Sequence, residues 1–531
     1  MHIEKVYSGK NNTHCTILLR ETYREEGKSK KRTLKNISDW SEERLAMLDT
    51  VLKDKVSISK KSTFDIDEIG LSSGKSYGAL YVFNSIAQSL NITDALGSSR
   101  EAKLALLMTV LRPIKAVSKL GMVSLADNQA VEEVLGIKKF DENSLYGALD
   151  WLEQNQARIE NELFKIRSAN CSTLYLYDVT SSYLEGKFNE FAEYGYNRDN
   201  KRGKKQIVIG LLKDEFGFPV SVRVYKGNTI DQKTVGDQIE KLKTFGVKNI
   251  VMVGDRGMIK QPQIKDLQGV NWNYITAITK PQILSMLDQG IIQLTIFDET
   301  LSEFEYDKKR YILRRNPKRA QEIRENRDQR LEKLQALVNL KLSKLELSKR
   351  MTAQKVYQQI CNAVAKYKLS SYVRLELIDG KIMFEIDQVK LIQTQDIDGC
   401  YALTTDLTKD ECEMNKVHSI YKDLAKLESG FKLMKSSLEI RPMWHRLAKR
   451  TVGHVVATML SLTILEEFER RIKGLNISVK AAIEALNSIQ LIEVQIGKEK
   501  IYKLPDSLRT TQISILEALQ IKLPKKIKKT A

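Results

Sequence analysis

The chain has 531 residues, enough for roughly three domains of about 150 residues each. Hydrophobic residues make up 42% and charged residues 29%, which is typical of a globular protein and excludes a disordered chain. The 86 basic and 67 acidic residues leave a net charge of +19, which favours a polyanionic partner. Nucleic acid is the first candidate, ahead of a ribosome or an anionic membrane surface.

Cysteine usage and the apolar segments argue against several other classes of protein. The five cysteines form no C-x-x-C pair, so we expect reduced thiols, and no histidine lies at zinc spacing from them. Residues 1–14 lack the apolar core of a signal peptide, and the apolar run near 455–465 is too short to span a bilayer. We therefore expect a cytoplasmic, nucleoid-associated protein without a structural zinc.

The N-terminal half begins with two regions of different character. Residues 1–60 predict a small β unit and a helix: a strand over 14–23, a basic turn containing Gly27, a second strand, and a helix opened by Ser41. Residues 77–168 have helical periodicity throughout, with Asp141 capping a long helix. Two helices around a turn containing Gly136 fit either plain helical packing or a DNA-binding helix-turn-helix.

Residues 170–280 predict the first part of an α/β core. Five strand-like runs and a helix over 231–246 follow in the order strand, strand, strand, helix, strand, helix, strand. The strand-like runs are 173–179, 205–212, 219–225, 249–255 and 273–279. This order indicates a mixed sheet with helices packed on it.

The remaining chain predicts an insertion followed by the rest of the core. Residues 281–400 form the expected insertion domain, and 308–350 carry fifteen Lys or Arg but only five acids. Leucines at helical spacing beneath that charge predict a helical hairpin, whose basic face is either solvated or a phosphate-contacting arm. Residues 401–475 complete the core with helices over 421–438 and 453–465, and 476–531 hold C-terminal helices and a basic tail.

Two aspartates stand where core strands are otherwise apolar. Asp178 interrupts the strand at 173–179, and Asp255 closes the strand at 249–255. A buried carboxylate without a partner is costly, so such acids need a ligand or a counter-charge. Two carboxylates at adjacent strand ends suit Mg²⁺, which prefers oxygen ligands, and can bridge two ions. Capping of the next turn, or pairing with an arginine, explains each aspartate equally well when it is taken singly.

Glu428 supplies a third acid on the helix predicted over 421–438. Tyr421 and Lys435 each lie seven residues from Glu428, which is two helical turns, so the three side chains share one face. A tyrosine, an acid and a lysine in one line suit a phosphate backbone held beside a metal ion. A solvated amphipathic helix shows the same spacing, so spacing alone leaves both interpretations open.

These segments together resemble the bacterial insertion-sequence transposases with a ribonuclease-H-like DDE core and the signature Y-x2-R-x3-E-x6-K. Tyr421, Glu428 and Lys435 match the signature, and Leu424 stands in place of its arginine. The surroundings of both aspartates and the basic stretch 441–445 are also similar to the family. The resemblance covers residues 170–470 and extends more weakly over the first 170.

The resemblance implies a fold and a set of site residues. The fold is α/β, with a ribonuclease-H-like mixed-sheet core interrupted by an insertion domain and preceded by a small β unit and a helical domain. Two Mg²⁺ or Mn²⁺ ions would be held by three catalytic acids: Asp178, Asp255 and Glu428. The residues expected to contact DNA are Tyr421, Lys435, Arg256, Arg441 and Tyr401.

Two of these positions come with alternatives. Lys422, Lys432 or Arg256 can take the place of the arginine that Leu424 replaces. Tyr401 lies where relatives with an insertion domain stack an aromatic side chain on a flipped base, a contact worth about 1–3 kcal/mol. An aromatic residue at the start of a strand is also a common core residue.

The function implied by the resemblance is that of a transposase. It would bind the terminal repeats of its element, cut there, and join the freed 3′ hydroxyls to target DNA, as a homodimer on double-stranded DNA. A nuclease of the same fold that cuts without joining is one alternative. A DNA-binding relic without activity is another, and Leu424 is the feature that keeps it open.

Overall fold

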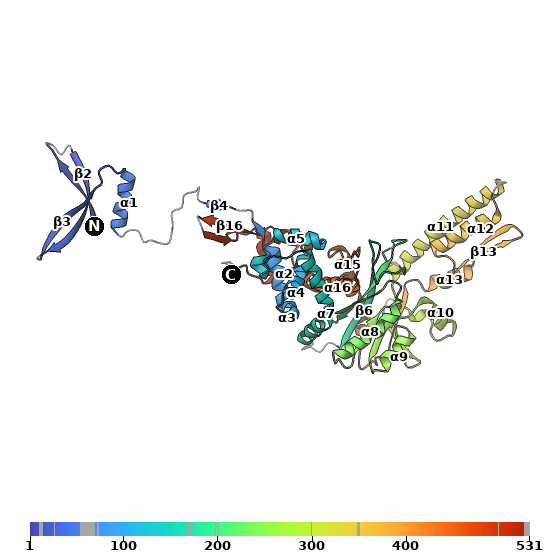
Figure 1. Cartoon of the computed structure of the whole chain (residues 1–531). Coiled ribbons are helices and arrows are strands. Elements are labelled where there is room, and N and C mark those ends of the chain that lie inside the picture. The colour runs from blue at the N-terminus through green and yellow to red at the C-terminus, as the bar shows by residue number, and fades with distance from the viewer. Residues whose placement is uncertain are drawn as a thin grey trace. The chain divides into compact units, whose positions relative to one another are not determined.

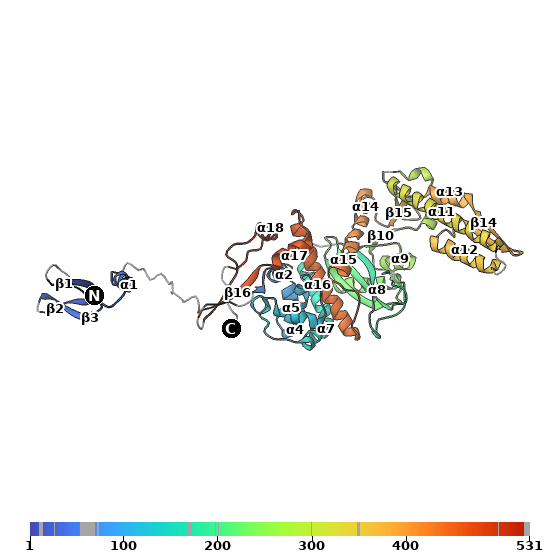
Figure 2. The ribbon, with the colours of Figure 1, turned by 90° about the horizontal axis from the view of Figure 1, so that it is seen from above.

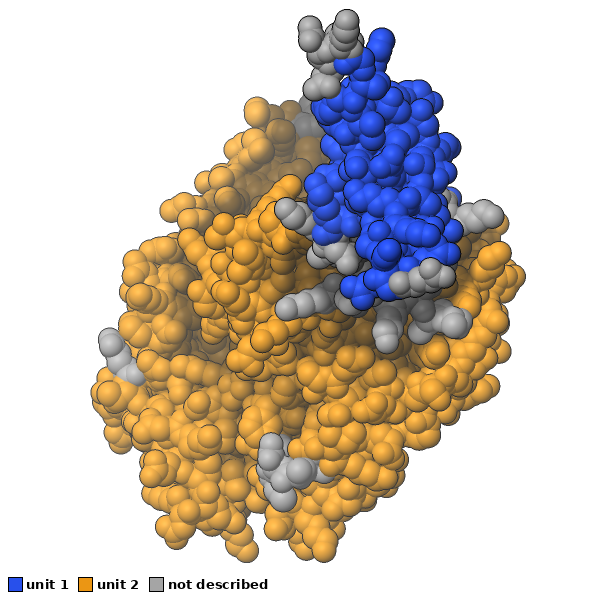
Figure 3. All heavy atoms as spheres, turned by 90° about the vertical axis from the view of Figure 1, so that its left-hand side faces the viewer, with its two compact units in different colours: residues 1–72, 493–501 blue, residues 73–492, 502–531 orange. Residues whose placement is uncertain are grey.

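The computed structural model of the chain describes residues 1–9, 14–25, 27–53, 69–71, 74–167, 173–196, 198–199, 201–298, 300–347, 351–496 and 499–524. The chain divides into two compact units (Figure 3). Unit 1 comprises Met1–Ser72 and Glu493–Ile501, and unit 2 comprises Ser73–Ile492 and Tyr502–Ala531. The predicted basic tail lies largely outside the described residues, since these end at 524.

Unit 1 contains the two predicted strands, as β2 and β3, and the predicted helix, together with further strands that were not expected. Its antiparallel sheet has the order β1-β2-β3, formed by β1 (His2–Ser8), β2 (His14–Glu25) and β3 (Lys28–Asn36). Gly27, with φ +76°, makes the tight turn between β2 and β3. Ser41 caps α1 (Glu42–Leu52) by accepting a hydrogen bond from the Arg44 amide. A further strand, β4 (Ile69–Leu71), pairs with residues 494–496 of β16 (Gln490–Ile496).

Unit 2 begins with the helices predicted over 77–168. They are α2 (Gly78–Ser89), α3 (Ile92–Leu96), α4 (Arg100–Leu111), α5 (Lys119–Asp127), α6 (Val131–Leu135) and α7 (Glu142–Arg167). The Asp141 carboxylate accepts a hydrogen bond from the Ser144 amide at 2.8 Å, which is the predicted cap of α7. The long apolar helix α16 (Ala448–Ile472) packs against α7, and Gly453 allows the close approach (Figure 1).

The central sheet of unit 2 follows the predicted element order without exception. Its first elements are β6 (Leu174–Tyr183), β7 (Gln206–Asp214), β8 (Pro219–Lys226), α8 (Asp231–Thr244), β9 (Val251–Gly254), α9 (Gln261–Gln268) and β10 (Asn273–Ala277). β6, β7 and β8 are antiparallel neighbours, while β9 runs parallel to both β6 and β10. The resulting order β10-β9-β6-β7-β8 is that of the expected ribonuclease-H-like core.

Both faces of this sheet are covered, which explains why its strands are apolar throughout. Tyr175 and Tyr177 of β6 pack in the core formed with α8 and α9. Leu174 and Leu176 point to the opposite face, whose core includes Leu427 of α15 (Leu424–Ser436) and residues of α16. Because side chains alternate along a strand, Asp178 belongs to the face that α15 covers.

The region predicted as an insertion contributes to the central sheet as well as forming a separate subdomain. The strands β11 (Ser302–Tyr306), β12 (Lys309–Arg315) and β15 (Cys400–Thr405) extend the sheet, in the order β11-β12-β15-β10. The elements between β12 and β15 are α11 (Pro317–Leu347), α12 (Ala353–Tyr367), β13 (Val373–Ile378), β14 (Lys381–Ile386) and α13 (Gln388–Asp396). The hairpin predicted within 308–350 is instead part of β12 and a single helix, α11, whose predicted apolar seam around Leu334 and Val338 packs on α12 (Figure 2). Before them come α10 (Lys280–Asp288) and the short 3₁₀ helix η3 (Leu294–Ile296).

The helix predicted over 421–438 is two helices in the structure. α14 (Met414–Lys422) ends one residue before α15 begins, and Asp423 between them keeps near-helical dihedral angles, φ −65° and ψ −13°. The break has a packing cause, since α14 lies against β9 and β10 whereas α15 packs on β6. Tyr421 therefore belongs to a different helix from Glu428 and Lys435.

The C-terminal region holds strands in addition to the predicted helices. Its helices are α17 (Val479–Asn487) and α18 (Thr510–Leu519), and its strands are β16 and β17 (Glu499–Lys503). Residues 490–491 of β16 pair with β5 (Lys75–Ser76) near the start of unit 2. Within the described residues, no helix combines the length and apolarity that a membrane span requires.

Candidate active site

Asp178 lies in the middle of β6, opposite Leu211 of β7. Its carboxylate accepts a hydrogen bond from the Val179 amide at 2.7 Å. Burial raises the pKa of Asp178 to about 7, and the negative charge of Asp255 adds to this effect, whereas the Arg198 guanidinium opposes it. A carboxyl group with this pKa gains or loses its proton near neutral pH, and a cation can bind it in place of the proton.

Asp255 is brought beside Asp178 by the parallel pairing of β6 and β9. Tyr177 is in register with Gly254, so the next residue along each strand is one of the two aspartates. Asp255 is exposed, and its Oδ1 accepts hydrogen bonds from the Arg256 amide at 2.7 Å and from the Tyr421 hydroxyl at 3.4 Å. The structure thus joins three of the predicted site residues: Asp178, Asp255 and Tyr421.

Tyr421 remains a neutral hydrogen-bond donor to this acidic pair. Burial raises the pKa of its phenol well above the ordinary value, and the negative charges of Asp255 and Asp178 raise it further. The hydroxyl is therefore protonated across the physiological range. It can donate either to Asp255 or to a phosphate oxygen placed beside it.

Glu428 lies on α15, the helix that packs on β6, and its side chain is exposed. Among the residues that the structure describes, no three His, Cys, Asp or Glu side chains gather closely enough to hold a metal ion. The structure therefore pairs Asp178 with Asp255 but does not gather Glu428 with them. The pair itself fits a divalent cation, because it offers hard oxygen donors whose mutual repulsion a cation would relieve.

Lys435 and Arg441, two of the expected DNA contacts, share one buried partner. Lys435 Nζ lies 2.8 Å from Asp199 Oδ1, and Arg441 Nη1 lies 2.5 Å from the same oxygen. The Asp199 side chain is only 1% exposed. The carboxylate of Asp199 thus pairs with both cations, and it occupies the position that a phosphate would need in order to bind them.

Asp199 and its neighbour Arg198 were not singled out from the sequence. Arg198 pairs with Asp231 at the start of α8, and its charge lowers the pKa of Asp178. Both residues lie in the stretch between β6 and β7, where no periodicity marks them. The only local signal is the alternation of basic and acidic residues around 198–202, which is common in surface loops.

The remaining expected DNA contacts lie at the ends of interior strands, Tyr401 at the start of β15 and Arg256 just after β9. Tyr401, half-buried in β15, hydrogen-bonds through its hydroxyl to His418 Nε2, and the two rings stack with centroids 5.8 Å apart. Arg256 is exposed and lines a cavity of about 440 Å³ together with Lys260 and Lys309. Leu424, at the signature's arginine position, packs against the core, whereas Lys422 and Lys432 are exposed.

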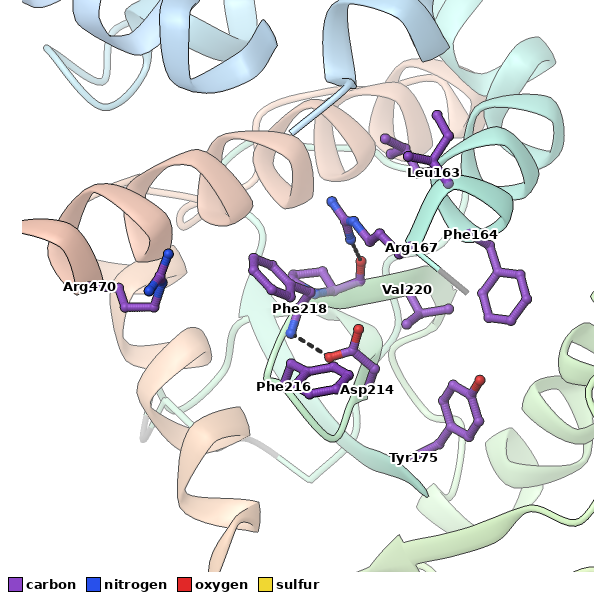
Figure 4. Close-up of a pocket in the computed structure, with 11 residues that line it drawn as sticks. Leu163, Phe164, Arg167, Tyr175, Asp214, Phe216, Phe218, Val220 and Arg470 are labelled. Atoms are coloured by element: carbon purple, nitrogen blue, oxygen red, sulfur yellow. Dashed lines mark hydrogen bonds between the residues drawn. The ribbon is translucent and has the colours of Figure 1, made fainter. Parts of the chain in front are cut away.

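A separate cavity of about 420 Å³ lies at the β7–β8 turn and takes no part in this site (Figure 4). Its walls are mainly apolar and aromatic, and Asp214 in it accepts a hydrogen bond from the Phe218 amide at 2.8 Å. Arg167 donates to the Pro219 carbonyl at 2.9 Å. Asp214 pairs with Tyr175, at the opposite end of the β6–β7 ladder from Tyr183. Its carboxylate stabilises the β7–β8 turn.

Comparisons with known proteins place the chain beside transposases. Among solved structures, the chain is similar to a piggyBac transposase in a synaptic complex with hairpin DNA, at 8% identity and a TM-score of 0.36, covering 74% of this chain and 70% of that one. It is also similar to Mos1 transposase in a paired-end complex with the left transposon end, at 13% identity and a TM-score of 0.15, covering 34% of this chain and 59% of that one. A comparison with curated protein sequences found no match.

Two protein families match the sequence. The N-terminal domain of IS1634 family transposases matches residues 3–63. The transposase DDE domain matches residues 169–464, a range that includes Asp178, Asp255 and Glu428. Because this second match spans more than half of the chain, the protein belongs to the transposases with a DDE domain.

Proposed function

We propose that this transposase binds the terminal repeats of its element and catalyses metal-dependent cleavage and strand transfer of DNA. The observation that carries the proposal is the pairing of Asp178 with Asp255 at adjacent strand positions, where burial and mutual repulsion raise the pKa of Asp178 to about 7. Such a pair is costly to a fold unless a cation uses it.

The metal ligands in this proposal are Asp178, Asp255 and Glu428. When bound, two Mg²⁺ or Mn²⁺ ions activate the attacking water or 3′ hydroxyl and stabilise the leaving oxygen. Asp178 and Asp255 hold their oxygens on the rigid sheet, whereas Glu428 comes from α15, which packs on β6.

The DNA contacts in this proposal surround the same acids. Tyr421 donates its hydroxyl to the backbone beside Asp255, and Lys435 and Arg441 exchange Asp199 for a phosphate. Arg256 and Tyr401 act at the ends of interior strands, where Tyr401 would need to leave His418 to stack on a base. The partners are the element's ends and the target DNA, and the chain acts as a homodimer so that two ends are cut together.

The test is a cleavage and strand-transfer assay on labelled DNA that carries the element's ends, with Mg²⁺ or Mn²⁺. We expect cutting and joining to need the metal and to disappear in Asp255→Ala, while DNA binding survives. The matched control is Asp266→Ala, which removes an exposed aspartate of the adjacent helix α9 and should keep full activity.

Other results of this assay separate the alternatives. Metal-dependent cutting without joining indicates a nuclease of the same fold. DNA binding with no cutting in either protein contradicts an active enzyme and leaves a DNA-binding relic. Glu428→Ala, compared with Ser429→Ala as its exposed neighbour, tests the third acid by the same readout.

A further inference from the structure

A cavity of about 280 Å³ in unit 2 is lined by several basic side chains that the proposed chemistry does not use. Five segments meet there: the end of α4, the start of α5, α7, residues 439–445, and α16. The side chains that matter are Arg112, Lys119, Tyr146, Trp444, His445 and His454.

Two of these cations are buried without a carboxylate. Arg112 is 4% exposed and donates to the main-chain oxygens of Leu438 at 2.6 Å and Glu439 at 3.1 Å, and its Nη2 also lies 3.2 Å from His454 Nε2. Lys119 is 5% exposed and makes no ion pair with any residue that the structure describes. A buried cation without a counter-ion is among the costliest features of a folded protein, so the pair implies an absent anion.

The protonation of Lys119 depends on that anion. Burial lowers the pKa of Lys119 to about 7, and the positive charge of Arg112 lowers it further. A bound anion would hold the proton on the amine. The one acidic side chain in the lining, Glu439, is exposed to solvent, and its charge only partly offsets the lowering of the Arg112 pKa by burial.

His454 adds a neutral donor to the cavity. Its Nε2 lies 3.2 Å from Arg112 Nη2, and because a guanidinium can only donate, this nitrogen must accept. The ring is neutral, since burial holds the pKa of His454 well below the ordinary value, so the proton is on Nδ1. That Nδ1 has no hydrogen-bond partner among the described residues.

The surroundings favour an anion that belongs to a nucleic acid. α5, nine residues long, begins at Lys119, so the positive end of its dipole faces the cavity. Trp444, 67% exposed, lines the cavity and offers a ring on which a base can stack. Arg441 lines the cavity and also pairs with Asp199 beside Lys435, so the cavity adjoins the expected DNA contacts.

We propose that this cavity binds a phosphate group through Lys119, Arg112 and His454. The phosphate can belong to a bound DNA strand or be a free phosphate ion. The choice of DNA as the source rests on the proposed function, whereas phosphate binding itself does not.

The first measurement uses the whole chain and inorganic phosphate as the probe, with chloride at equal ionic strength as the control. We expect saturable heat of binding and a rise in the midpoint of thermal unfolding with phosphate concentration. Lys119→Met should lower phosphate affinity by about tenfold or more, because a charge-assisted hydrogen bond is lost. Lys115→Met, which removes an exposed lysine nearby, should leave the affinity unchanged.

The second measurement distinguishes the two sources of phosphate. Binding of duplex element-end DNA is followed by fluorescence anisotropy without divalent metal, for wild type, Lys119→Met, Lys119→Arg and Lys115→Met. Weaker DNA binding by Lys119→Met, recovered in Lys119→Arg, assigns the phosphate to DNA. Loss of inorganic phosphate binding with unchanged DNA binding assigns it to a free ion.

The proposal is overturned if wild type binds no inorganic phosphate and all four proteins bind DNA equally. Thermal unfolding of each variant shows whether it is folded, and Trp444→Phe provides a second variant that leaves the buried cations in place. Neither measurement depends on cutting. A protein that binds phosphate but does not cleave DNA would refute the proposed function, whereas the proposed phosphate site would stand.

Discussion

Asp178 stands on β6 between the buried residues Tyr177 and Val179, and this location sets its chemistry. Its raised pKa comes first from burial and then from Asp255, a residue 77 positions further along the sequence. The sequence showed that both acids were out of place in apolar strands. Only the pairing register of β6 with β9 placed the two aspartates side by side, which makes Asp255 a neighbouring charge of Asp178.

The raised pKa predicts how Asp178 affects stability in the absence of metal. In the folded chain its pKa is about 7, above the ordinary 3.8, so the unfolded chain releases this proton more readily. The loss of folding stability caused by ionising the buried Asp178 is absent below the ordinary pKa of 3.8, grows as the pH rises, and is complete above about pH 7. With chelator present, Asp178→Asn should therefore unfold at a higher temperature than wild type at pH 8, and at almost the same temperature as wild type at pH 4.

This prediction is checked by thermal unfolding at several pH values. Asp266→Asn is the control, because it changes an exposed aspartate and should show no such trend. A difference between Asp178→Asn and wild type that is constant with pH would contradict the raised pKa.

Asp199 allows a second prediction at the scale of single residues. Its buried carboxylate holds both Lys435 and Arg441, so Asp199→Asn should free two cations for DNA phosphates. We expect duplex DNA to bind about fivefold more tightly, roughly 1 kcal/mol, with some loss of folding stability. Anisotropy at fixed salt measures the affinity, and weaker DNA binding by the variant would show that Asp199 positions the two cations instead of competing with DNA.

Helix packing is the main determinant at the scale of elements. α16 presses so closely on α7 that a Cβ at Gly453 would lie 2.0 Å from the carbonyl oxygen of Leu149. The same principle separates α14 from α15, since each packs on different strands and Asp423 lies between them. A periodic sequence predicts a helix, but the surface on which the helix packs decides where it is interrupted.

The close contact at Gly453 predicts a destabilised variant. Gly453→Ala should force α16 away from α7 and lower the free energy of unfolding by about 1–3 kcal/mol, the usual cost of overpacking. The matched control is Gly147→Ala on α7, where an added Cβ meets nothing within 4 Å. That variant should be neutral or stabilised by about 0.4–1 kcal/mol. Equal effects of both changes in urea unfolding would contradict the packing argument.

At the scale of the whole molecule, charge and long-range pairing dominate. The net charge of +19 includes the basic stretch 308–350, which carries fifteen basic residues and five acids and contains α11. The central sheet is assembled from strands between residues 174 and 405, with β15 inserted between β12 and β10. Such pairing between distant segments cannot form from local preferences alone.

The charge predicts strongly salt-dependent DNA binding. Without divalent metal, the affinity for duplex DNA should fall by about a thousandfold or more between 50 and 200 mM salt if six or more phosphates are neutralised. Anisotropy titrations across this range give the slope of log affinity against log salt. Asp255→Ala should give the same slope, because it keeps the basic surface, whereas a flat dependence in wild type would exclude extensive phosphate contact.

The element order of the core, the leucine seam of the α11–α12 hairpin and the cap of α7 could be predicted because each depends on residues close in sequence. The candidate acids could also be predicted, since an aspartate in an apolar strand is a local anomaly. The addition of β11 and β12 to the central sheet could not, because both come from the region predicted as an insertion and pairing partners are chosen by the register of segments far apart. Asp199 and the buried Lys119 were missed for the same reason.

The sequence by itself determined the periodicities, the charge and the identity of the acids, because these reside in side-chain chemistry and short-range spacing. The tertiary structure decided which charges meet. It placed Asp255 beside Asp178 with Tyr421 above it, gave Lys435 and Arg441 a common carboxylate, and buried Arg112 and Lys119 together. Burial and proximity are properties of the packed chain, and they set the pKa of a group and its need for a ligand.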